Sequence, residues 1–144
     1  MTDVIPRPAW AEIDLGAVRR NVALIGEKLS EHTQFMAVVK ANAYGHGDIA
    51  VARAALEAGA TWLGVILVDE GLRLREAGIE APILLLHETP VERIDEALAN
   101  ELTPCLFTEK GLWALGEAAD RAHRCAQRGW RCRRAHIAAG KRHD

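Results

Sequence analysis

Residues 61–87 read TWLGVILVDEGLRLREAGIEAPILLLH and form a unit of two apolar runs around a charged segment. The runs TWLGVILV and APILLLH predict buried strands, because each is short, uninterrupted and rich in aliphatic residues. The segment DEGLRLREAGI predicts a helix, with acids in its first turn and Gly78 at its end. Two such strands joined by a helix indicate a parallel pair with a helical crossover.

The same alternation extends toward the N-terminus. The run QFMAVVK predicts a strand, and GDIAVARAALEAGA predicts a helix with Asp48 at its N-cap and Gly59 at its end. A further helix is predicted from about Asp14, a suitable N-cap, with apolar residues at helical spacing, namely Val18, Val22 and Ile25.

The alternation also continues toward the C-terminus. TPVERIDEALANE predicts a helix with Thr89 at its cap and Pro90 at the first helical position. LTPCLF predicts a strand weakened by Pro104, and TEKGLWALGEAADRA predicts a fourth crossover helix.

Four buried strands, each followed by an amphipathic helix, predict an α/β fold with parallel strands. Two closures fit this pattern: an open doubly wound sheet, and a (β/α)8 barrel of the TIM type. Four strands are half of such a barrel, since a complete one takes roughly 250 residues. The period of the apolar residues does not choose between the two closures.

The segment AVVKANAYGHG, residues 37–47, places Lys40 at the end of a buried strand. One interpretation is a surface lysine just past the strand. The other is an amine at the mouth of the sheet, where partial desolvation makes it a nucleophile suited to a Schiff base with an aldehyde cofactor. Tyr44, the only tyrosine, either donates to a phosphate beside that amine or simply covers the mouth. Gly45 and Gly47 permit a tight turn, which by itself is a weak phosphate signal.

This segment resembles the pyridoxal-phosphate signature of the alanine racemases. The resemblance extends through WAEIDLGAVRRNV, ARAALEAGATWLGV, DEGLRLREAGIEAPILLLHE and LTPCLFTE, and covers residues 8 to about 120. It implies the N-terminal half of a (β/α)8 TIM-type barrel, incomplete in this chain. In the family a β-rich domain follows the barrel, and the enzyme is a head-to-tail homodimer.

The resemblance also implies roles for individual residues. Lys40 forms the Schiff base with pyridoxal 5'-phosphate and is one of two catalytic bases, Tyr44 binds the phosphate, and Leu86 lines the cofactor pocket. Asn42 and His46 belong to the motif without a separate role. The implied reaction interconverts L-alanine and D-alanine and supplies D-alanine for peptidoglycan, although racemases for serine or a broader range of amino acids share much of the motif.

The amino-acid composition indicates the general class of protein, its location and whether to expect a metal site. Hydrophobic residues make up 49% and charged residues 26% of the 144 residues, which is typical of a globular protein. We expect a cytoplasmic location, because we see no signal peptide and no apolar run of about 20 residues. The three cysteines have no metal-ligand spacing, so we expect free thiols and no metal site.

The C-terminal residues differ from the rest of the chain. Residues 1–120 hold ten Lys and Arg against nineteen Asp and Glu, whereas residues 121–144 hold eight against one. We therefore expect a partial barrel over residues 1–120 and an atypical basic tail over residues 121–144. The tail is interpreted as a truncated or frame-shifted end, in preference to a genuine basic extension. A nucleic-acid-binding tail is the weakest alternative, since no recognised motif accompanies the charge.

The tail bears on activity. RAHI, residues 134–137, is the candidate start of a fifth strand. The Asp-Thr-Gly-Met segment and the second catalytic tyrosine of the family have no counterpart in the sequence. We therefore expect the chain alone to be inactive, and the alternative function is a non-catalytic remnant that at most binds pyridoxal phosphate.

Overall fold

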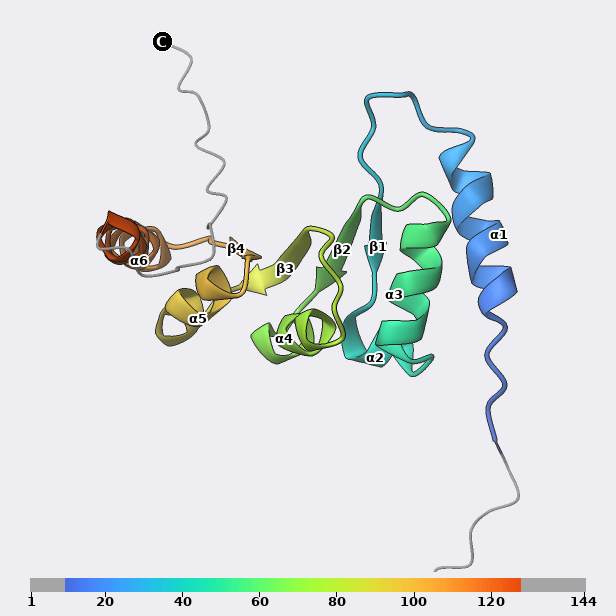
Figure 1. The fold of residues 1–144 in the computed structure, drawn as a ribbon, viewed down its shortest axis with the longest axis horizontal. Coiled ribbons are helices and arrows are strands. Elements are labelled where there is room, and N and C mark those ends of the chain that lie inside the picture. The colour runs from blue at the N-terminus through green and yellow to red at the C-terminus, as the bar shows by residue number, and fades with distance from the viewer. Residues whose placement is uncertain (1–9, 128–144) are drawn as a thin grey trace, which may run out of the picture.

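A computed structural model describes residues 10–127 as a row of strands and helices in regular alternation (Figure 1). Its elements, in chain order, are α1 (Leu15–Gly26), β1 (Met36–Val38), α2 (Lys40–Tyr44), α3 (Asp48–Glu57), β2 (Trp62–Val65), α4 (Val68–Glu76), β3 (Ile83–Glu88), the 3-10 helix η1 (Val91–Arg93), α5 (Ile94–Ala99), β4 (Leu102–Cys105) and α6 (Glu109–Gln127).

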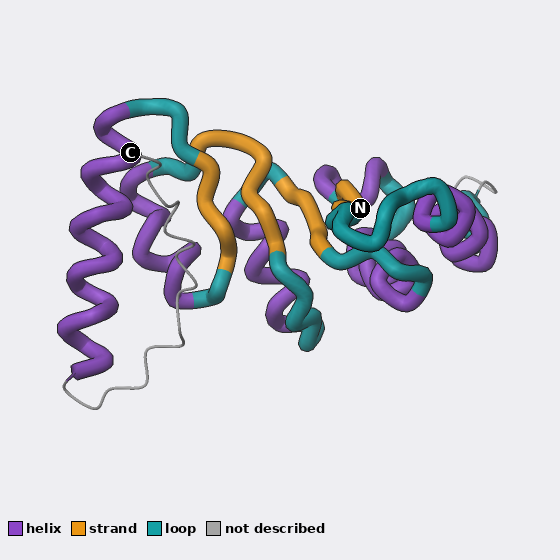
Figure 2. The backbone as a smooth tube through the Cα atoms, turned by 90° about the horizontal axis from the view of Figure 1, so that it is seen from above, coloured by secondary structure: helices purple, strands orange, loops and turns teal. Residues whose placement is uncertain are grey.

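The four strands form one parallel sheet in the order β1-β2-β3-β4. Figure 2 shows them side by side in chain order, with α1 and α6 at opposite ends of the row. A doubly wound sheet reverses its strand order at a switch point, and the described strands contain no reversal. This order is that of a barrel wall, so the structure confirms the α/β parallel fold and favours the barrel closure.

The crossover helices all cover the same face of the sheet. Alternate strand residues such as Leu63, Val65, Ile83 and Leu85 are at most 1% exposed. They form one apolar cluster with residues of three helices, namely Ala52 in α3, Leu74 in α4 and Ala97 in α5. Burial of this face is the main source of stability, at roughly 1.5–3 kcal/mol for each large aliphatic side chain.

The opposite face carries the other alternate residues and is less covered. A side chain on Gly64 would approach Met36 Sδ to 2.9 Å and Leu86 Cδ1 to 3.1 Å, so these groups share that face. Val38 lies there too and is 39% exposed. In a closed barrel this face is the interior, which the remaining strands cover.

Several helix starts follow the sequence prediction, and two do not. Asp14 caps α1 as expected, with its carboxylate accepting from Ala17 N at 3.0 Å. Asp48 is not the N-cap of α3: Gly47 holds that position with φ 90°, and Asp48 Oδ1 accepts from Ile49 N at 2.9 Å. The glycine is favoured there because its φ is positive.

The predicted helix after Thr89 is also different in the structure. Thr89 is buried and its N–H donates to Cys105 O at 3.0 Å. It therefore continues the pairing of β3 with β4 and does not cap a helix. Pro90 precedes the short helix η1, and α5 begins only at Ile94.

Two boundaries shift relative to the sequence prediction. The second strand ends at Val65, whereas the apolar run extends to Val68. The last helix extends to Gln127, beyond the predicted end of the fourth crossover helix. Most of the basic tail, including the candidate fifth strand RAHI, lies outside the described residues.

Candidate functional site

The segment after β1 is a left-handed turn. Within α2, Ala41, Asn42 and Ala43 have φ between 50° and 55° and ψ between 45° and 49°, and Tyr44 has φ 56°. Each L-residue in this region costs about 1–2 kcal/mol, so four of them cost roughly 4–8 kcal/mol. Strain of this size persists only where the surroundings enforce it, and it is characteristic of functional sites.

Hydrogen bonds within the segment hold the turn in place. Ala43 N donates to Val39 O at 2.9 Å, and Gly47 N donates to Asn42 O at 2.9 Å. Two motif side chains take part as well: Asn42 Oδ1 accepts from Asp48 N at 3.1 Å, and His46 Nδ1 lies 2.9 Å from Ala43 O. The structure thus gives Asn42 and His46 a conformational role that the sequence did not suggest.

Lys40 and Tyr44 lie at the two ends of this turn and face each other. Lys40 Nζ is 6.0 Å from the centroid of the Tyr44 ring, a cation–π distance. Tyr44 is 61% exposed and Lys40 is half-buried. Within residues 10–127 no carboxylate pairs with Lys40, so the amine is not held by a counter-ion there.

Glu70, at the start of α4, connects the turn to the next strand–helix unit. One carboxylate oxygen accepts from Ala41 N at 2.6 Å, and the other accepts from Ile66 N at 2.9 Å and Leu67 N at 3.0 Å. Burial acts to raise the pKa of this carboxyl, but the backbone N–H donors of Leu67, Ile66 and Ala41 outweigh it and hold the pKa below its ordinary value. The sequence prediction took Glu70 only as an acid in a first helical turn, because a contact between residues 29 positions apart leaves no periodic signal.

An ion pair between half-exposed Arg73 and buried Asp48 joins α4 to the start of α3. Arg73 Nε donates to Asp48 Oδ2 at 2.9 Å, and Asp48 is 5% exposed. Hydrogen bonding with Asp48, followed by its charge, raises the pKa of Arg73. Asp48 N in turn donates to Asn42 Oδ1, so this pair fixes the far end of the left-handed turn.

Leu86 lies in β3, on the face opposite the helices. The strand register pairs Val38 with Gly64 and Gly64 with Leu84. Lys40 and Leu86 each follow their paired residue by two positions, so both stand at the carboxyl end of the sheet. Active sites of barrel enzymes lie at this end.

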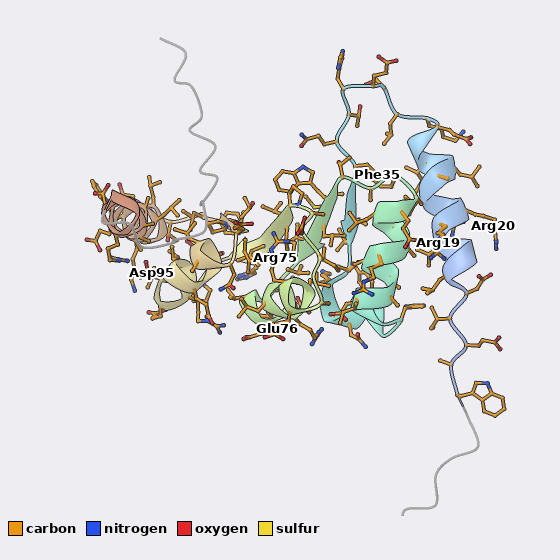
Figure 3. All side chains as sticks on the ribbon, viewed as in Figure 1. Arg19, Arg20, Phe35, Arg75, Glu76 and Asp95 are labelled. Carbon is orange, nitrogen blue, oxygen red and sulfur yellow. The ribbon has the colours of Figure 1, made fainter. Side chains whose placement is uncertain are left out.

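A hollow of about 870 Å³ lies at the opposite end of the sheet, between the ends of α4 and α5. Its side of α4 carries Arg75 and Glu76 (Figure 3). The Arg75 guanidinium donates to four backbone carbonyls, those of Asn100, Ile79, Ala81 and Glu101, at 2.7–3.0 Å. Because these contacts occupy the guanidinium, we interpret this hollow as a structural junction and place the site at Lys40.

The described residues contain neither a membrane-spanning helix nor a metal-binding cluster. None of the helices within residues 10–127 is long and apolar enough to cross a membrane. No group of three or more His, Cys, Asp and Glu in that part of the chain is arranged to hold a metal ion.

A parallel α/β wall in this strand order is characteristic of a barrel protein, and its candidate site is the lysine on the strained turn at the carboxyl end. The family model for the alanine racemase N-terminal domain matches residues 13–129. The chain therefore belongs to the alanine racemase family, through its N-terminal domain.

Individual relatives agree with this membership. The chain is 48% identical over 113 residues to alanine racemase 1 of Oceanobacillus iheyensis, covering 78% of this chain and 30% of that protein. It is 56% identical over 92 residues to the alanine racemase of Nostoc sp., covering 64% of this chain and 24% of that protein.

Solved structures of the family share the fold. Alanine racemase of Clostridium difficile in complex with cycloserine superposes with a TM-score of 0.76 at 34% identity, covering 83% of this chain and 32% of that one. Alanine racemase from Streptomyces coelicolor superposes with a TM-score of 0.71 at 40% identity, covering 77% of this chain and 30% of that one. The chain thus spans about a third of the length of its relatives, and its described fold is that of a part of their N-terminal barrel.

Proposed function

We propose that this chain supplies the lysine-bearing wall of a pyridoxal-phosphate-dependent alanine racemase. The observation that carries the proposal is Lys40, an amine without an ionic partner in the described residues, on a left-handed turn at the carboxyl end of the sheet. Membership of the alanine racemase family supports the reaction class.

The residues around Lys40 fit the cofactor chemically. An aldehyde needs a primary amine, which Lys40 Nζ provides. A phosphate needs hydrogen-bond donors, and the Tyr44 phenol lies on the same turn and is accessible. The aliphatic side chain of Leu86 suits the flat ring of a pyridine. We therefore propose that Lys40, Tyr44 and Leu86 bind pyridoxal 5'-phosphate.

Lys40 has two roles in the proposed reaction. Pyridoxal phosphate, when bound, supplies the electron sink that makes the α-carbanion of an amino acid accessible. Lys40 Nζ would hold the cofactor through its aldehyde group, and the same amine would move the α-proton on one face of the substrate. Inversion also requires a base on the opposite face, and by the resemblance this is a tyrosine of the second subunit of a homodimer.

The rigid turn serves this chemistry. A base that both holds a cofactor and transfers a proton must be positioned closely, because small displacements from the reactive geometry slow a reaction strongly. The hydrogen bonds of Asn42, His46 and Glu70 restrict the backbone that follows Lys40. The proposed substrate is alanine, with D-alanine delivered to peptidoglycan synthesis in the cytoplasm. Serine is the alternative substrate.

The test is a titration of the 144-residue chain with pyridoxal phosphate, followed by absorbance in the visible range. The lysine-linked cofactor gives a visible band that borohydride reduction abolishes. Lys40→Ala should remove this band. Lys110→Ala, which changes an exposed lysine in α6, should leave it unchanged. A band that persists in Lys40→Ala overturns the assignment.

A further inference from the structure

The left-handed turn is held from outside at one point close to Lys40. The N–H of Ala41, the residue after Lys40, donates to Glu70 Oε1 at 2.6 Å, and Glu70 comes from the following strand–helix unit. Ala41 is the first residue of the turn with positive φ, at 51°. The carboxylate therefore contacts the backbone where the left-handed conformation begins.

The carboxylate is itself fixed by its second oxygen. Glu70 Oε2 accepts from Ile66 N and Leu67 N, which lie directly after β2. These two N–H groups donate to a side chain and not to a neighbouring strand, and β2 ends at Val65, directly before them. A single side chain thus joins the segments that follow β1 and β2, at the carboxyl end of the sheet, where Lys40 lies.

The same helix holds the far end of the turn. Arg73, three residues after Glu70, pairs with Asp48, and Asp48 N bonds the Asn42 side chain. Glu70 and Arg73 therefore restrain the turn at Ala41 and at Asp48, on either side of Tyr44. The strained backbone lies between these two restraints, as expected of a conformation that the surroundings impose.

We propose that Glu70 is a positioning residue for the cofactor lysine: its carboxylate fixes the Ala41 N–H and thereby holds Lys40 and Tyr44 in the arrangement that binds pyridoxal phosphate. The inference rests on the proposed function and extends it to a residue that acts through the backbone of the turn. Hydrogen bonds that involve a charged group are stronger than those between neutral groups. One oxygen of Glu70 accepts from the turn after β1, and the other accepts from the segment after β2.

The geometry requires a carboxylate in particular. All three partners of Glu70 are N–H donors, and both oxygens are used. A glutamine has one acceptor oxygen and one donor NH2 group. Glu70→Gln therefore keeps the size and leaves a donor facing a donor, either at Ala41 or at Ile66 and Leu67.

The experiment compares the ¹⁵N-labelled 144-residue chain with Glu70→Gln and with Glu76→Gln. Glu76 is the matched control, because it is an exposed glutamate on the same helix with no side-chain hydrogen bond or ion pair among the described residues. Amide hydrogen exchange is measured at Ala41, with buried Ala52 of α3 as the internal reference. The affinity for pyridoxal phosphate is measured from the visible band.

We expect Glu70→Gln to exchange Ala41 about tenfold faster relative to Ala52, and to bind pyridoxal phosphate about tenfold more weakly, since loss of a charge-assisted hydrogen bond is a change of at least this order. Glu76→Gln should match the unchanged chain in both. A general loss of stability would accelerate Ala41 and Ala52 together, so their ratio isolates the local effect.

The outcomes separate the two proposals. An unchanged chain without a lysine-dependent band refutes the proposed function, and the exchange ratio then still decides whether Glu70 holds the turn. A band that Glu70→Gln leaves at full affinity, with unchanged Ala41 exchange, refutes the role of Glu70 alone. Where Glu70→Gln does not fold, the unchanged chain decides: an Ala41 amide that exchanges as fast as an unstructured one overturns the inference, and a protected one supports it.

Discussion

Replacing Gly71 in α4 by alanine should destabilise the protein, although alanine is the better helix former. An added Cβ would lie 2.8 Å from Leu102 Cδ1 and 2.9 Å from Leu102 Cδ2. Ordinary carbon–carbon contact begins at about 3.5 Å, so Leu102 or α4 must retreat by roughly 0.7 Å. Leu102 is 3% exposed and has no free space to enter.

The magnitude is a balance of two effects. Alanine gains about 1 kcal/mol over glycine in a helix interior. Overpacking a close-packed core costs about 1–3 kcal/mol. We therefore expect Gly71→Ala to lower the free energy of unfolding by about 1 kcal/mol. Gly116→Ala in α6 isolates the first effect, since nothing lies within 4 Å of its added Cβ, and it should raise that free energy by about 1 kcal/mol.

The assay is urea unfolding of the two variants and the unchanged chain, compared at equal slope so that a change in midpoint reports stability. The predicted difference between the two alanine variants is about 2 kcal/mol, with opposite signs relative to the unchanged chain. If Gly71→Ala stabilised the protein as much as Gly116→Ala does, the tight packing of α4 on β4 would be refuted.

Two further predictions concern groups that join one unit to the next. Arg75→Ala removes the hydrogen bonds from one guanidinium to four backbone carbonyls and should lower the free energy of unfolding by about 2 kcal/mol. The control is Arg53→Ala, which removes a single hydrogen bond to Ala77 O and should lower that free energy by less. The pKa of Glu70 lies below its ordinary value in the folded protein, so its stabilising effect is present above the ordinary pKa and is lost as the pH falls through the lowered pKa. Acid titration of stability should therefore be shallower in Glu70→Gln than in Glu76→Gln, and equal slopes would contradict this assignment.

The sequence predicted the order and type of the main elements, because the apolar runs and helical spacings are dictated by a core on one face of a sheet. Leu63, Ile83 and Leu74 are such residues, and all are fully buried. The spacing of apolar residues along the chain could not distinguish a barrel from a doubly wound sheet, since both closures bury the same faces of the strands. Strand order decides it, and strand order is a property of the fold.

The site was predicted only in outline. The placement of Lys40 at the end of a strand follows from the apolar run before it. The left-handed backbone from Ala41 to Tyr44 does not, because its two alanines and the tyrosine disfavour that conformation and only Gly45 and Gly47 signal a turn. Glu70 was missed for the same kind of reason: its contact with Ala41 depends on how two units pack, which no local pattern encodes.

The most direct test of the central claim is to locate the cofactor on the chain. The chain contains four lysines, Lys28, Lys40, Lys110 and Lys141. After incubation with pyridoxal phosphate at a concentration near that of the protein, borohydride reduction and peptide mass mapping give the share of label at each lysine. The proposed site predicts that Lys40 carries most of the label. Label spread evenly over the four lysines, or concentrated at another one, would contradict it.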